Sequence, residues 1–188
     1  MTSREREVPA AVTWGLLAAW AVHDTEELLT MGGWLDRARP RLRRRFPRVP
    51  EKVWDRMRVT PAQAAIAIGA VGLVVAAAAA DGARTGGRSQ FYQATLVGFG
   101  LHTGGHLAQS AITGGYTPGV VTAPIVAAPF SVWALRRLRR AGVPIDTGGS
   151  PATAVLFAGG AILAAQGLAR VLTRSRPAAS GSTVAAGP

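Results

Sequence analysis

Cysteine is absent from this chain of 188 residues, and charged residues are scarce. Without cysteine the protein has no disulfide framework and no thiolate chemistry. Charged side chains make up 16% of the residues, against about 25% in a typical soluble domain. This deficit, together with a positive mean hydropathy, favours a membrane protein over a soluble globule.

Acidic residues are the scarcer charged class, with 10 against 21 basic residues and a net charge of +11. Such an excess of basic charge can signal a nucleic-acid partner. Here, however, the arginines gather at the ends of apolar runs, where membrane proteins place them. No zinc-finger spacing or helix-turn-helix context accompanies them. We therefore expect the partner to be the lipid bilayer and not nucleic acid.

Five apolar segments approach or exceed the length of about 20 residues that a membrane-spanning helix needs. They cover about 9–35, 61–80, 90–112, 119–135 and 151–172. The fourth is the shortest, and its prolines at 124 and 129 predict kinks. We predict an all-α, integral membrane helical bundle of about five transmembrane helices, forming a single domain over 1–172. The tail, 173–188, is predicted to be disordered.

The connection between the first two segments carries much of the basic charge, with ten of the basic residues between Asp36 and Thr60. Pro40, Pro47 and Pro50 exclude one long helix there. We interpret the connection as a cytoplasmic loop lying on anionic lipid; the alternative is a binding surface for an anionic headgroup. The distribution of basic residues predicts an outside N-terminus and a cytoplasmic C-terminus. Because alanine, glycine and arginine are abundant, as in GC-rich bacteria, we place this multi-pass protein in a bacterial inner (plasma) membrane.

The first apolar segment is interrupted by the string His-Asp-Thr-Glu-Glu at 23–27. Ionisable residues at membrane depth are costly and tend to face a partner, a cavity or an ion. Residues three and four apart share one face of a helix, so His23, Glu26, Glu27 and Thr30 are predicted to project together. Asp24 points about a quarter-turn away and is the less favoured member.

The two remaining histidines, His102 and His106, lie four residues apart in the third segment, and Gln109 continues their stripe. The first and third of five spans must run in the same direction. Both clusters fall near the centre of their segments, so we expect them at one depth near the bilayer midplane. Side by side, the two helices would bring three imidazoles and two carboxylates into one site.

This donor set has a chemical meaning, because imidazole and carboxylate suit divalent transition metals. We predict one or two ions of zinc or iron, with either glutamate, Glu26 or Glu27, as ligand or general base. Thr30 and Gln109 are candidates to support the ligands. The predicted metal ligands are His23, Glu26, Glu27, His102 and His106.

Several functions are compatible with such a site. The leading hypothesis is an intramembrane metal-dependent enzyme acting on a lipid or another apolar small molecule, because a midplane site with little extramembrane chain favours a substrate arriving from the bilayer. A metal-free acid–base lipid isomerase or cyclase is a second hypothesis. A proton- or metal-coupled transporter is a third, since buried histidines and carboxylates form proton relays. A structural or regulatory polar network is a fourth, and a homo-oligomer is compatible with each.

The motifs together resemble a known family. HDTEE, the later FGLHTGGHLAQS and the following YTPGVVTAPIVAAPFSVWAL are similar to the HXXEE-domain family, over about Trp14 to Leu138. The resemblance implies a small bacterial integral membrane protein. The residues that match the family's motifs are His23, Glu26, Glu27, His102 and His106. The resemblance does not imply any particular reaction. Composition alone predicts that the turn at 114–119 is only a tight cap between helices.

Overall fold

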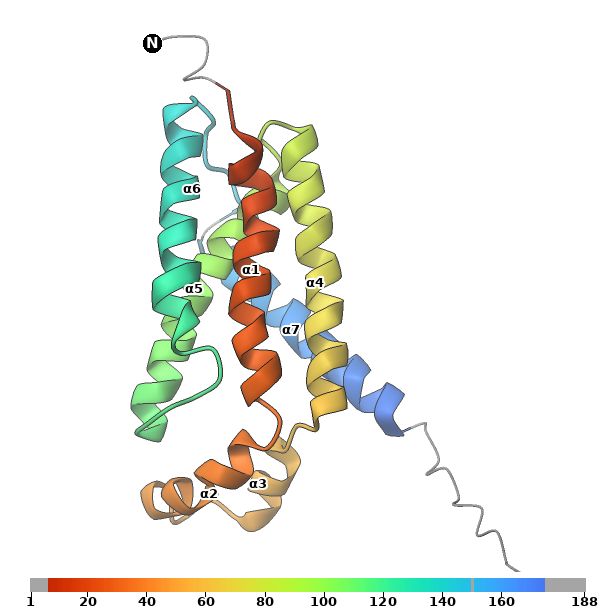
Figure 1. The fold of residues 1–188 in the computed structure, drawn as a ribbon, viewed down its shortest axis with the longest axis vertical. Helices are drawn as coiled ribbons and strands as arrows, with labels where there is room; N and C mark the ends of the chain where they lie inside the picture. Colours follow the sequence, from red (N-terminus) through yellow and green to blue (C-terminus); the bar gives the residue numbers. More distant parts are fainter. Residues whose placement is uncertain (1–6, 150, 175–188) are drawn as a thin grey trace, which may run out of the picture.

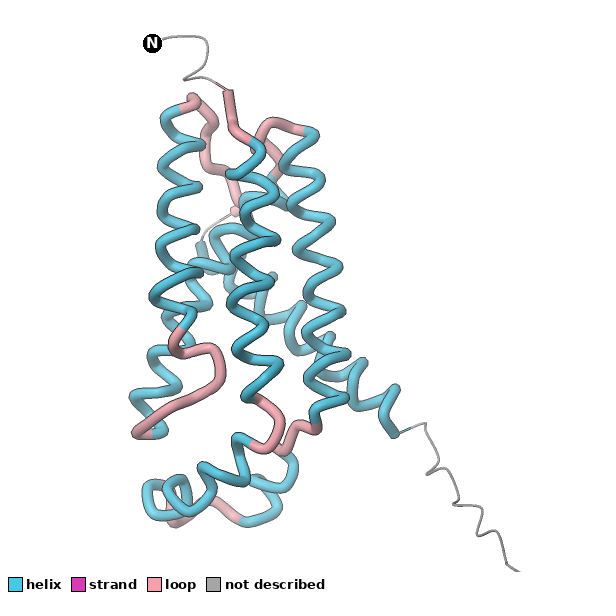
Figure 2. The backbone as a smooth tube through the Cα atoms, in the orientation of Figure 1, coloured by secondary structure: helices cyan, strands magenta, loops and turns pink. Residues whose placement is uncertain are grey.

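The computed structural model describes residues 7–149 and 151–174. These residues form seven α-helices and one π-helical turn, with no strand among them. The elements are α1 (Ala10–Thr30), α2 (Trp34–Arg45), α3 (Glu51–Met57), α4 (Pro61–Arg84), α5 (Gln90–Thr113), the π-helical turn η2 (Ala123–Ala127), α6 (Ala128–Arg140) and α7 (Pro151–Arg174). The described part of the chain is therefore all-helical, as predicted, and Figure 2 shows how little of it lies in loops.

Four helices, α1, α4, α5 and α6, run lengthwise through the molecule, while α7 crosses obliquely behind them (Figure 1). α1 packs against α4 and α6, and α7 packs against α4 and α5. α1 and α5 run in the same direction, toward the end where α2 and α3 lie (Figure 1). This parallel arrangement allows the two histidine-bearing helices to present their side chains at one level.

Each of the five predicted apolar segments contains a helix, although the first is divided between α1 and α2. Within the described residues, two stretches are long and apolar enough to cross a membrane, Pro61–Arg84 and Val155–Thr173. α1 is not among them, because its acidic residues lower its mean hydropathy, and α6 is not among them, because it has only 13 residues. Two such helices give weak support for membrane association and do not by themselves establish a five-span bundle.

Side-chain hydrogen bonds define the ends of several helices. Thr60 and Gln63 form a reciprocal capping box that starts α4, and this satisfies backbone N–H groups that have no partner inside the helix. The Gln63 amide also donates to Thr173 Oγ1 at 3.1 Å, which ties the start of α4 to the end of α7. Thr173 and Arg174, predicted to begin a disordered tail, are instead the last two residues of α7; 175–188 lie outside the described residues.

The kinks predicted for the fourth segment take the form of the π-helical turn. Pro124 lies within η2, and Pro129 lies in the first turn of α6. Proline lacks the N–H that a continuing α-helix would use, and π turns are often found at functional sites. η2 packs against α1 and α5, so the irregular backbone lies next to the histidine-bearing helices.

The basic connection is folded and is not one loop. It contains α2, which continues through Pro40, and α3, which begins after Pro50. Arg39 bridges Glu51 at 2.8 Å and Asp55 at 2.7 Å, and with Arg43 these contacts hold the pKa of both acids below the usual values. The two helices are therefore joined by ion pairs across the end of the bundle.

Arginines of α2 also bind the end of α5. Arg41 Nε donates to the Thr113 carbonyl at 3.2 Å, and Arg45 donates to that of Ile112. The last carbonyls of a helix lack partners and carry partial negative charge, so cations stabilise them. Part of the basic charge in this segment thus has a structural role that the sequence pattern does not reveal.

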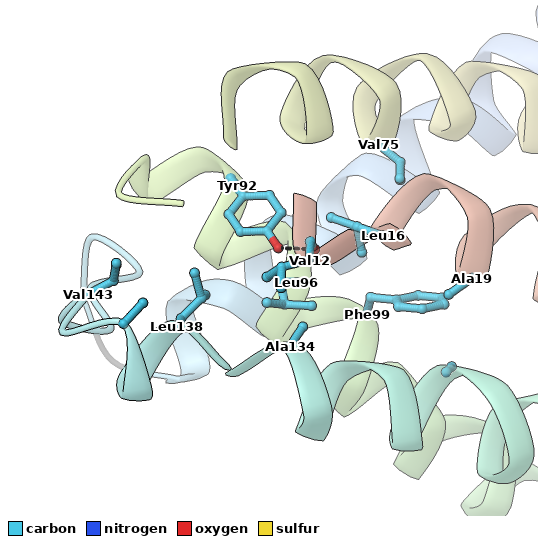
Figure 3. Packing of buried hydrophobic residues seen from close by; sticks show 12 residues of the cluster. Val12, Leu16, Ala19, Val75, Tyr92, Leu96, Phe99, Ala134, Leu138 and Val143 are labelled. Carbon is cyan, nitrogen blue, oxygen red and sulfur yellow. Dashed lines mark hydrogen bonds between the residues drawn. The ribbon is translucent and has the colours of Figure 1, made fainter. Parts of the chain in front are cut away.

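The main core lies between α1, α4, α5 and α6. Tyr92 is fully buried and its hydroxyl donates to the Val12 carbonyl at 2.6 Å (Figure 3). Leu16, Leu96 and Leu138 are also fully buried in this cluster. Small residues allow the close approach of the helices, since a Cβ on Gly82 would lie 2.5 Å from the Tyr92 ring.

Gly82→Ala is expected to destabilise the protein by about 1–3 kcal/mol, because the added methyl group overpacks against Tyr92. Gly69→Ala, in the same helix with nothing within 4 Å of the added Cβ, should instead be neutral or stabilising by up to about 1 kcal/mol. Thermal unfolding in detergent, followed by circular dichroism, compares the two variants. A lower midpoint for Gly69→Ala than for Gly82→Ala would contradict this account of the packing.

Candidate metal centre

Four side chains from α1 and α5 meet inside the bundle. His23 and Glu27 lie one helical turn apart on α1, and His102 and His106 lie one turn apart on α5. One nitrogen or carboxylate oxygen from each lies within 4.8 Å of the others. The structure thus brings together four of the five predicted metal ligands.

His106 connects the group to the backbone on one side and to its neighbours on the other. Its Nδ1 lies 2.9 Å from the Pro118 carbonyl oxygen, which can only accept a hydrogen bond, so Nδ1 carries the proton. Its Nε2 lies 2.7 Å from His102 Nε2 and 3.3 Å from Glu27 Oε1. The lone pair of His106 Nε2 therefore faces the other ligands.

His23 is held in the same way through Thr122. The Thr122 hydroxyl donates to Glu26 Oε2 at 2.6 Å, because a carboxylate only accepts. His23 Nδ1, 2.8 Å from the same hydroxyl oxygen, must then be the donor to it. The opposite nitrogen, Nε2, carries a free lone pair, is fully buried and has no hydrogen-bond partner. An imidazole that is 1% exposed thus leaves one nitrogen unsatisfied.

Glu26 is not brought into the four-residue group. Its carboxylate accepts hydrogen bonds from the Tyr116 hydroxyl at 2.8 Å and from the Thr122 backbone N–H at 2.8 Å, and more distantly from the Val121 N–H. These donors occupy the oxygens that a metal would need. Through these contacts Glu26 orients Thr122, and Thr122 in turn orients His23.

The side chains of the two predicted supporting residues, Thr30 and Gln109, form no hydrogen bond with the four ligand side chains. Thr30 donates to the backbone carbonyl of Glu26 at 2.7 Å, a bond within its own helix. Gln109 lines the two cavities beside the site and bonds to none of the four ligand residues.

The segment after α5 completes the site, although its sequence predicts only a tight cap. Tyr116, Pro118 and Thr122 supply the hydrogen bonds described above. Gly119 has a φ of +82°, and a Cβ there would lie 2.9 Å from Glu27 Oε1 and 2.8 Å from His106 Nδ1. The signal for these residues was the Tyr-Thr-Pro-Gly string of the family resemblance, since hydropathy carries none.

The site lies nearer one end of the bundle than the predicted midplane. The apolar segment 9–35 is not one helix: α1 ends at Thr30, and Gly33, with a φ of +74°, starts α2. At a rise of 1.5 Å per residue, Glu27 lies only about 4 Å and His23 about 10 Å from the end of α1. His106 likewise lies nearer the end of α5, whereas His102 lies near the middle of that helix.

Two cavities adjoin the ligands. The first, of about 230 Å³, lies between α1, α4, α5 and α7 and has mainly apolar walls. The second, of about 670 Å³, lies between the end of α1, the start of α2 and the segment leading into α4. Both are bordered by the side chains of Glu27, Met31, Gln109 and Gln166. The ligand group can thus be approached from an apolar side and from a more polar side.

The donor set fits a divalent transition metal. Histidine ligands usually donate their second ring N–H to a carbonyl or to a carboxylate network, which fixes the tautomer, and His23 and His106 both do so here. Three imidazoles and one carboxylate form a four-donor set of the kind that zinc and iron accept. An ion would also satisfy the buried Nε2 of His23.

The fold and the site define an all-helical protein in whose interior a histidine–glutamate group could hold a metal ion. Residues 14–134 match the model of the family described as a protein of unknown function with HXXEE motif. The chain therefore belongs to the HXXEE family, and its name-giving residues are His23, Glu26 and Glu27. No curated protein and no solved structure matches the chain at a significant level.

Proposed function

We propose that this protein is a multi-pass protein of the bacterial inner membrane that binds one divalent transition metal ion and acts as an enzyme on a lipid or another apolar small molecule. Zinc and iron are the favoured metals. The proposed ligands are His23, Glu27, His102 and His106. Glu26 is proposed to orient the site and not to bind the ion.

The observation that carries the proposal is the unpartnered Nε2 of His23. Burying a polar nitrogen without a partner is unfavourable, and native proteins rarely leave one unsatisfied. One donor atom from each of the four residues, His23 included, lies within 4.8 Å of the others. A single ion bound by all four satisfies this nitrogen and separates the crowded Nε2 atoms of His102 and His106.

The surface supports a location in the membrane. Leu29, Leu73 and Leu163 are each about three-quarters exposed, at 77%, 75% and 74%, on three different helices. Large apolar side chains are exposed on most of the described helices, as expected for a surface in contact with lipid. The basic residues of α2, α3 and the end of α6 lie at the two ends of the long helices (Figure 1), as expected at the membrane surfaces.

The apolar cavity supports an apolar substrate, because its walls of valine, phenylalanine, isoleucine and alanine lie directly beside three of the proposed ligands. A bound metal would supply Lewis-acid activation of water or of a substrate oxygen. Glu27 borders both cavities, so it is placed either to bind the ion or to take up a proton from a group bound there.

The test is elemental analysis of the detergent-purified wild-type protein from cells supplied with zinc and iron. We expect about one ion per chain that survives gel filtration, as for a four-donor protein site. The element found narrows the class of reaction. A folded sample without any metal would rule out this proposal and favour metal-free acid–base chemistry or proton coupling.

A further inference from the structure

Asp24 stands out among the residues that line the apolar cavity. The polar lining groups come from α1 and α5, apart from the α7 residue Gln166, whereas α4 contributes only apolar side chains. Asp24 is 8% exposed, and its carboxyl group forms no hydrogen bond or ion pair with any described residue. A carboxyl group without a partner therefore faces a largely apolar space.

Asp24 is not placed to serve the metal. It does not belong to the group of His23, Glu27, His102 and His106 whose donor atoms converge. On a helix it is rotated by about 100° from His23, and it lines the apolar cavity. No arginine or lysine lines the cavity, so no residue within 7–149 or 151–174 neutralises or binds this carboxyl group.

We propose that Asp24 determines substrate specificity by accepting a hydrogen bond from a hydroxyl or amine carried by an otherwise apolar substrate. This deepens the proposed function and rests on it. A buried polar group without a protein partner needs one from the ligand. In either protonation state a carboxyl group keeps an acceptor oxygen, so the match to a donor does not depend on its charge.

The dimensions of the site limit the size of the substrate. The cavity volume of about 230 Å³ exceeds the roughly 150 Å³ that accommodates benzene in an engineered apolar cavity. It therefore accepts a ring or a short alkyl chain beside Asp24. The second cavity, which shares Glu27 and Met31 with the first, offers room for a further part of a longer molecule.

The experiment uses two photoreactive probes, an octanol that carries an aliphatic diazirine and the methyl ether of the same molecule. The detergent-purified protein is irradiated with each, and labelled peptides are quantified by mass spectrometry. In the wild type we expect the alcohol to label cavity peptides about ten-fold more than the ether, the effect of one hydrogen bond to a buried group. Asp24→Leu should abolish this preference, whereas Asp24→Asn, which keeps an acceptor oxygen, should retain it.

Thr25→Val is the matched control, because Thr25 is exposed beside Asp24 and its hydroxyl bonds to Ala21 of its own helix. It should keep the preference. Equal labelling by alcohol and ether in the wild type, or a preference that persists in Asp24→Leu, would overturn the inference. Metal content is measured on the same samples: loss of metal in both Asp24 variants would also overturn it, whereas a metal-free wild type would instead remove the proposed function.

Discussion

The variant with both His102→Ala and His106→Ala is expected to be purified without bound metal, whereas the wild type retains about one ion per chain. The double change removes two of four converging donors, and the remaining imidazole and carboxylate do not form a stable four-coordinate site. Elemental analysis against protein concentration measures the loss. Far-UV circular dichroism and gel filtration in detergent establish that the variant is folded, and an unchanged metal-to-protein ratio would refute the assignment.

The same measurement separates the two glutamates of the motif. Glu27→Gln is expected to lose the metal nearly completely, because it removes the only carboxylate of the group. Glu26→Gln should retain a site with about 10–100-fold weaker affinity, since it disturbs only the hydrogen bonds that orient Thr122 and His23. Gln109→Ala, which changes the cavity lining alone, should keep full metal content. Equal losses for both glutamate variants would show that Glu26 binds the ion directly.

Gly119→Ala is expected to reduce metal occupancy at least ten-fold although no ligand is changed. A residue with a Cβ is strained by about 1–2 kcal/mol in the left-handed region, and the added carbon would lie 2.9 Å from Glu27 Oε1 and closer still to the His106 ring. Relief of this clash must move His106 or Glu27 out of line with the other donors. Titration of the metal-free protein with zinc measures the change in affinity.

Gly105→Ala provides the control for this prediction. Gly105 adjoins His106 in the sequence, but it is helical and nothing lies within 4 Å of an added Cβ. It should bind metal as the wild type does. If the Gly119 and Gly105 variants bound zinc equally well, the close approach of Gly119 would have no part in forming the site.

Much of the fold could be predicted because apolar runs of sufficient length are dominated by burial and backbone hydrogen bonding. Each of the five predicted segments contains a helix, and His23 and His106 meet as the parallel helices required. The folding of the basic connection could not be predicted in the same way. α2 continues through Pro40 because its apolar residues, Leu35, Ala38 and Leu42, are buried and its arginines bind α3 and α5, which outweighs the local cost of proline.

The roles of the individual site residues were harder to predict from the sequence. Glu26 and Glu27 are adjacent and chemically alike, and both fall on the broad face predicted to hold the site. Which one faces the metal group depends on where η2 and the preceding turn pack. There Thr122 and Tyr116 bind Glu26, and this leaves Glu27 toward His106. Asp24 was the less favoured site member in the sequence analysis. That it lines a cavity without a protein partner became clear only from the packing of α4 and α7.

The amino-acid sequence by itself determined that this protein is helical, that it lacks thiol chemistry, and that its three histidines and the two glutamates of the motif, Glu26 and Glu27, lie on two parallel helices. These properties follow from local composition, periodicity and the order of the segments. The tertiary structure alone decided which donors converge, how far the site lies from the end of the bundle, and that Gly119 and Thr122 shape it. The reason is physical: convergence depends on the rotation and packing of helices against one another, and contacts between distant residues set these.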